Sequence, residues 1–230
     1  MLNSLFWPSI EWIIGGSILG FVISGLFAGL LGLARDRFLV AYATIAGVFI
    51  YGFIALNEID VTAILAQNWG GGILVGALAS IFLVRHVKSQ PASRQTSRGR
   101  LFFDLSWAGL VYGLIDALFL NVMPVVAAQV SLSQFDWSGS IPGKISTGAL
   151  GLFASLLIAL TYHLGYPEFR NPKVRLVLVG NSIITLAYLV SGNPLASIIS
   201  HTAMHLAAVW HGPETTIQLP PHYQTTTELN

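Results

Sequence analysis

The chain has no cysteine, and only 9% of its residues are charged. The lack of cysteine excludes disulfide bonds, a thiolate nucleophile and a cysteine-ligated metal site. Soluble globular proteins carry about 25% charged residues, so this low charge content excludes an ordinary soluble domain. The net charge is only +1, and the basic residues lie in short loops instead of on one face, which gives no indication of a nucleic-acid partner.

Apolar residues make up 54% of the chain, and its mean hydropathy is +0.70. Because backbone polar groups inside a bilayer must pair within the protein, long apolar segments predict membrane-spanning helices. The sequence therefore predicts an all-α protein, a polytopic transmembrane bundle of about seven helices in contact with membrane lipids. The expected helices are 10–33, 38–56, 61–85, 104–129, 145–165, 174–191 and 194–210.

Lys and Arg are distributed unevenly among the expected loops. Ten of the eleven follow the first, third or fifth helix, and only Lys144 lies on the other side. The positive-inside rule then places the amino terminus outside and the carboxyl terminus in the cytoplasm, with the plasma membrane as the expected location.

Four parts follow from this order. They are an amino-terminal three-helix scaffold (1–88), a basic cytoplasmic linker (89–103), a four-helix membrane core (104–211) and a polar, disordered cytoplasmic tail (212–230).

Ionisable side chains in the core are the main indication of function, because each costs about 2.5–3.5 kcal/mol to place in hydrocarbon. His201 and His205 are four residues apart, so they share a helix face, as do the paired histidines of zinc-binding helices. Asp116 lies twelve residues beyond Asp104, about 18 Å along the helix. Apart from Arg175 in the first turn of 174–191, no Lys or Arg lies inside the four core helices, which leaves histidine or a metal as the cationic partner of Asp116. The alternative is that both histidines merely form hydrogen bonds with neighbouring groups.

Three segments of the core are similar in order and spacing to the motifs of one family. They are 114–120 (LIDALFL), 155–165 (SLLIALTYHLG), which contains His163, and 191–205 (SGNPLASIISHTAMH). Over about 110 residues the chain resembles the CPBP family, the membrane-embedded proteases that include CAAX prenyl endopeptidases and bacteriocin-processing proteins. That family carries Glu-Glu-x-x-x-Arg in one helix, Phe-x-x-x-His in the next and His-x-x-x-Asn in the last.

The motifs depart from the family pattern at several positions. Ile115 stands at the first glutamate, Asp116 at the second, and Leu120 replaces the arginine. Ala159 replaces the phenylalanine, and His205 stands where asparagine is usual. A carboxylate one residue along a helix is rotated by about 100°, so Asp116 does not reproduce the missing glutamate. Aspartate and an additional histidine are, however, metal-ligand types.

Three hypotheses follow. The first is an intramembrane metalloprotease, similar to CAAX proteases, that hydrolyses a membrane or lipidated peptide with Asp116, His163 and His201 as catalytic residues. Its cofactor would be zinc or another divalent metal, held by four side chains: Asp116, His163, His201 and His205. The second is a catalytically inactive relative that binds a protein or lipid partner, and the third is a small transporter or proton relay. If the resemblance holds, these side chains converge in one polar pocket between the fourth, fifth and seventh helices.

Overall fold

The computed structural model describes residues 6–93, 97–212 and 218–219, and within these ranges the chain forms helices and no strands. The prediction of an all-α bundle is therefore confirmed. The α-helices are α1 (Phe6–Ile23), α2 (Arg35–Leu56), α3 (Val61–Ala66), α4 (Trp69–Lys88), α5 (Arg98–Asp104), α6 (Tyr112–Asp116), α7 (Met123–Leu132), α8 (Ile141–Gly165), α9 (Val174–Ser191) and α10 (Leu195–His211). Short π-helices are η1 (Ser24–Leu30), η2 (Leu105–Val111) and η3 (Ala117–Val122), and 3-10 turns are η4 (Asp136–Gly139) and η5 (Pro167–Phe169).

Six helices of the described chain are long and apolar enough to cross a membrane. The seventh expected segment is α10, whose 17 residues are at the lower end of the roughly 17–25 that a span needs. Large apolar side chains cover the outside of the bundle; Leu30 is 77% exposed and Val190 75%. Such a surface is stable against lipid and unstable in water, so the protein is an integral membrane protein.

The prediction of one helix over 61–85 was wrong, because the chain breaks between α3 and α4. Asn68 adopts a left-handed conformation (φ 49°), and its side chain donates a hydrogen bond to the Ser191 carbonyl at 2.7 Å. Asn193 donates to the Gln67 carbonyl at 2.5 Å, so one side chain of the turn itself and one from the far end of the sequence hold it.

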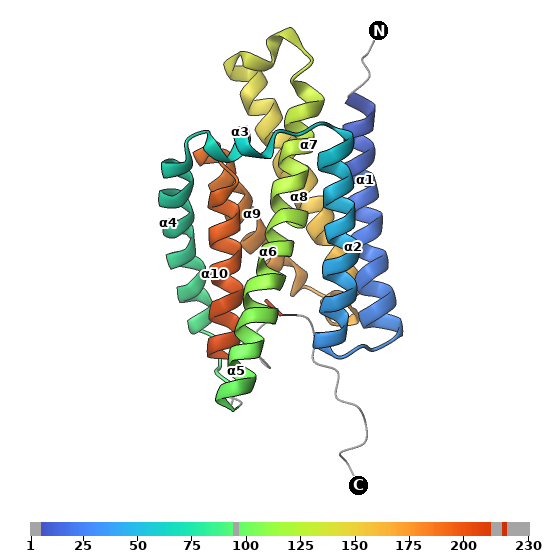
Figure 1. Cartoon of the computed structure of the whole chain (residues 1–230), viewed down its shortest axis with the longest axis vertical. Helices are drawn as coiled ribbons and strands as arrows, with labels where there is room; N and C mark the ends of the chain where they lie inside the picture. The colour runs from blue at the N-terminus through green and yellow to red at the C-terminus, as the bar shows by residue number, and fades with distance from the viewer. Residues whose placement is uncertain (1–5, 94–96, 213–217, 220–230) are drawn as a thin grey trace.

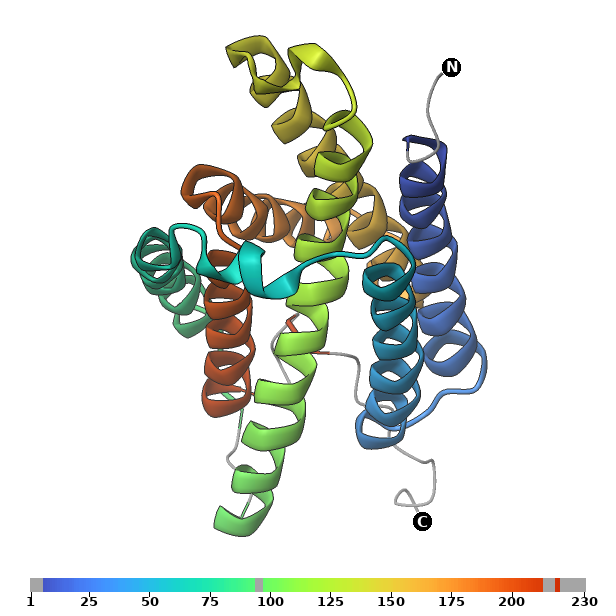
Figure 2. The same ribbon diagram turned by 45° about the horizontal axis from the view of Figure 1, so that its top comes forward.

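One long helix, Arg98–Leu132, runs through the middle of the molecule and contains α5, η2, α6, η3 and α7 in turn (Figure 1). It extends the expected helix 104–129 at both ends, and the linker predicted at 89–103 is therefore helical from Arg98 onward. The pair α1 and α2 lies on one side of it and the pair α4 and α10 on the other, in both views (Figures 1 and 2). Helix α8 packs against α1, α7 and α9.

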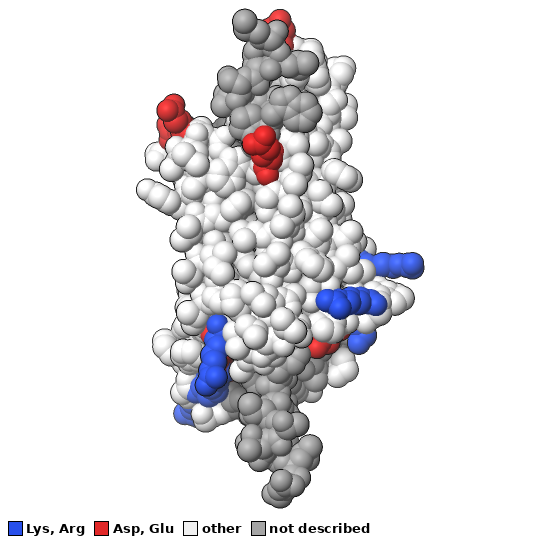
Figure 3. Space-filling model, turned by 90° about the vertical axis from the view of Figure 1, so that its right-hand side faces the viewer, with Lys and Arg blue, Asp and Glu red and all other residues white. Residues whose placement is uncertain are grey.

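Lys and Arg gather at one end of the bundle, the end at which α10 finishes (Figures 1 and 3). We predict that this end faces the cytoplasm. Because the chain has no cysteine, single cysteines introduced at Ser93 and Gln134 report cleanly on the two sides. A membrane-impermeant thiol reagent should label position 93 only from the cytoplasm and position 134 only from outside. Labelling of both positions from one side would contradict this topology.

Candidate metal centre

Asp116, His201 and His205 form a buried cluster in which one ligand atom of each residue lies within 4.8 Å of the others. Asp116 ends α6 of the long central helix, and both histidines project from one face of α10. The three side chains are 5% exposed or less. Two helices that are about 80 residues apart in sequence therefore bring together the carboxylate and the histidine pair that the sequence singles out.

The distances in this cluster are those of ion pairs and leave room for a shared cation. Asp116 Oδ2 lies 3.4 Å from His205 Nε2 and 3.8 Å from His201 Nε2, longer than an ordinary hydrogen bond. Zinc ligands at 2.0–2.2 Å in tetrahedral geometry are separated by roughly 3.3–3.6 Å. The donor set, one carboxylate and two imidazoles, also suits zinc and related divalent metals, so the residues fit a metal ion.

Tyr42 orients the carboxylate of Asp116. Its hydroxyl donates to Asp116 Oδ1 at 2.5 Å, which leaves Oδ2 facing the two histidines. Tyr42 is fully buried and comes from α2, in the half of the chain that the sequence indicated to be scaffold only. Nothing in the local sequence around a single tyrosine of α2 indicates this role.

Asn121 orients the ring of His201. Its amide nitrogen donates to Asn181 Oδ1 and to Thr185 Oγ1, each at 2.9 Å, so its oxygen is left as an acceptor. His201 Nδ1 donates to that oxygen at 2.7 Å, and its Nε2 therefore presents a lone pair towards Asp116. A hydrogen bond of this kind from the outer nitrogen is the usual support of a metal-ligating histidine. The intramembrane asparagines at 121 and 181 were a sequence signal for this network, and sequence reasoning missed it.

His205 has fewer hydrogen-bond partners than His201. Its Nδ1 is buried without a hydrogen-bond partner among the described residues. Its ring stacks on His201, with centroids 5.1 Å apart, and meets the edge of Tyr112 at 4.6 Å. A buried polar atom without a partner costs about 1–3 kcal/mol, and His205 thus lacks the support at Nδ1 that Asn121 gives to His201.

Two π-helical stretches, η2 and η3, flank the short helix α6 that ends at Asp116. A π-helical turn adds a residue to the α-helical repeat and rotates the next turn of the helix, and such turns are frequent at functional sites. The direction in which Asp116 points is thus set by its own helix as well as by Tyr42.

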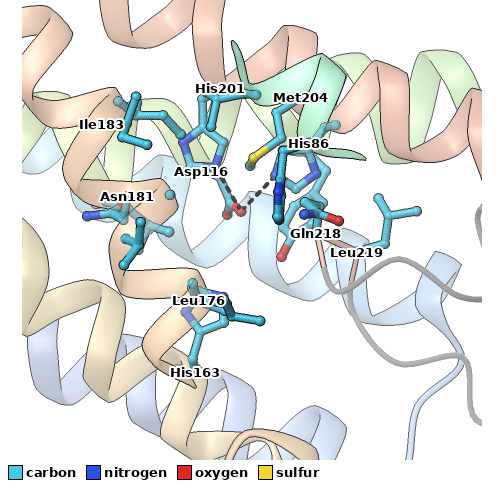
Figure 4. A pocket seen from close by; sticks show the side chains of 18 of the residues that line it. His86, Asp116, His163, Leu176, Asn181, Ile183, His201, Met204, Gln218 and Leu219 are labelled. Atoms are coloured by element: carbon cyan, nitrogen blue, oxygen red, sulfur yellow. Dashed lines mark ion pairs between the residues drawn. The ribbon is translucent and has the colours of Figure 1, made fainter. Parts of the chain in front are cut away.

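The cluster lies against a cavity of about 240 Å³, which His163 also lines (Figure 4). The predicted convergence of these side chains in one pocket is thus present, although the lining is mainly apolar and α4 and α9 contribute to it as well. His163 lies apart from the three clustered ligands, as Figure 4 shows. Its Nδ1 donates to the Ala159 carbonyl at 2.7 Å. Of the tail predicted at 212–230, Gln218 and Leu219 also line the cavity, while 213–217 and 220–230 lie outside the described residues.

No protein family, curated protein or solved structure matches the chain. The functional interpretation therefore depends on the site itself.

Proposed function

We propose that the protein is a metal-dependent intramembrane hydrolase, with zinc or another divalent ion held by Asp116, His201 and His205. The observation that carries this proposal is the convergence of three buried ligand atoms, one carboxylate oxygen and two imidazole nitrogens, within 4.8 Å of one another. Intramembrane ionisable groups are costly, and a cation shared by all three offsets that cost.

A metal bound by three protein ligands supplies an activated water at neutral pH. The chain's own residues hold the ligands: Tyr42 positions Asp116, and Asn121 positions His201. His163 lies across the cavity with Nδ1 bound to a backbone carbonyl, which keeps Nε2 available to accept and return a proton.

A peptide is the substrate class that the resemblance to the CPBP family favours, in the form of a membrane or lipidated peptide. The mainly apolar cavity beside the cluster is compatible with such a substrate. The reaction proposed is hydrolysis of an amide bond by the activated water.

A catalytically inactive relative is the second candidate, and one observation favours it. Leu120, at the position of the family's arginine, is only 1% exposed and lines the cavity, so an apolar side chain takes the place of that charge. Such a protein would keep the fold and bind a partner without hydrolysing it.

His163→Asn tests the catalytic proposal. We expect the metal-loaded wild-type protein to cleave a membrane-inserted or prenylated peptide, and the variant to do so at least about 100-fold more slowly, because proton transfer is lost. The measurement is product formation by mass spectrometry, with metal content determined on the same samples. His86→Asn is the matched control, because His86 lines the same cavity but is exposed on α4. A metal-loaded wild type that cleaves no peptide of either kind would favour the inactive relative.

A further inference from the structure

The two sides of the cavity differ in exposure. On one side the lining residues are lipid-facing: Phe82 of α4 is 58% exposed, and Leu176 and Val179 of α9 are 54% and 59% exposed. Elsewhere the lining is closed, since Phe169 and Leu219 are 5% exposed or less. Three of the four exposed lining residues are large and apolar, the fourth being His86, so this opening faces mainly the bilayer.

Helices α4 and α9 form this opening. Their ends away from the basic side are joined by the hydrogen bond from Asn68 to the Ser191 carbonyl. The lining residues of α4 come from its last two turns and those of α9 from its first three. The opening therefore lies at the end of the bundle where the basic residues gather.

Four cations lie at the ends of the two helices that form this opening: Arg85 and Lys88 in the last turn of α4, and Lys173 and Arg175 at the start of α9. All four are exposed, and within the described parts of the chain none of them forms a salt bridge. Arg85 is next to the lining residue His86, and Arg175 next to Leu176. The amino terminus of α9 adds the positive end of a helix dipole. Apart from Asp116 at the cluster, no acidic residue of the described chain lines the cavity.

We propose that this opening is a lateral binding site for an anionic phospholipid. One acyl chain enters the apolar cavity between α4 and α9, and the anionic headgroup stays among the four cations at the membrane surface. Anionic lipid is attracted by each nearby Lys or Arg, and the apolar lining accepts the chain. This binding does not depend on a metal at the Asp116 cluster.

The test uses a fluorophore on a cysteine introduced at Met204, which lines the cavity. In vesicles, phosphatidylglycerol with brominated acyl chains should quench this fluorophore at least about twofold more than brominated phosphatidylcholine at equal content. Arg85→Gln with Lys88→Gln should abolish that preference. The matched control, Arg37→Gln with Arg98→Gln, removes two exposed cations of the same end that do not flank the opening, and should preserve it.

Gly180→Leu tests the apolar part of the site. Gly180 lines the cavity, and a Cβ atom there would meet nothing within 4 Å, so leucine fills the opening without a clash. We expect quenching at position 204 to fall at least about fivefold. Gly47→Leu, where the space is equally free but no cavity is lined, should leave it unchanged.

Equal quenching by the two lipids would overturn the anionic part of the proposal. Quenching that persists in Gly180→Leu would overturn entry of the acyl chain. A second fluorophore, at lipid-facing Val190, shows that each variant is folded and inserted. None of these substitutions alters Asp116, His201 or His205, so metal content measured on the same samples separates a failure of this site from a failure of the metal site.

Discussion

We expect the wild-type protein to take up about one divalent ion per chain and His205→Asn to bind none. The substitution takes away one of three clustered ligands, and the remaining pair, Asp116 and His201, is too few to hold the ion tightly. The measurement is elemental analysis of purified protein after incubation with zinc and removal of the excess. Uptake by the wild type should also fall on acidification, because protons compete with the metal for imidazole nitrogen.

Two further variants make this result specific. His163→Asn changes a histidine of the same cavity that lies outside the cluster, and we expect it to keep the ion. Asn121→Leu removes the acceptor that holds His201 Nδ1, and the affinity should fall about 10–100-fold without complete loss. A wild type that binds no transition metal would contradict the metal centre and leave the fold without the proposed chemistry.

We expect Gly165→Ala to destabilise the bundle strongly. A Cβ atom at Gly165 would overlap Ser24 Oγ and lie 2.7 Å from the Gly25 nitrogen. Ser24 is fully buried, and its hydroxyl donates to the Gly20 carbonyl at 2.8 Å, so it has no free space to move into. The end of α8 must then separate from η1, at a cost of about 3 kcal/mol, the upper end for overpacking.

Gly180→Ala is the matched control, because the added Cβ would meet no atom within 4 Å. We expect a clear fall in the thermal midpoint of Gly165→Ala in detergent and no fall for the control. Equal midpoints would show that η1 and the end of α8 do not approach each other as closely as the structure has them.

Local composition determined most of the architecture. Each membrane helix is recognisable by itself. Its backbone hydrogen bonds form within the segment, and its side chains are apolar because charge in lipid is costly. The expected segment 174–191 matches α9 at both ends, and 38–56 matches the end of α2. Asp116, His201 and His205 were also recognisable, because a costly ionisable group in an apolar segment needs a partner. The spacing of four residues is enough to place both histidines on one helix face.

Long-range contacts decided the rest. The break in 61–85 depends on hydrogen bonds from Asn68 to Ser191 and from Asn193 to Gln67, more than 120 positions apart. No local pattern predicts such bonds.

The same reason applies to the site. Tyr42 is 74 positions from Asp116, and Asn121 is 80 positions from His201. The sequence by itself determined which side chains require a partner inside the membrane. Only the packing of α2, α10 and the long central helix decided which partners they have, because orientation around a shared ion depends on atoms that approach one another in space.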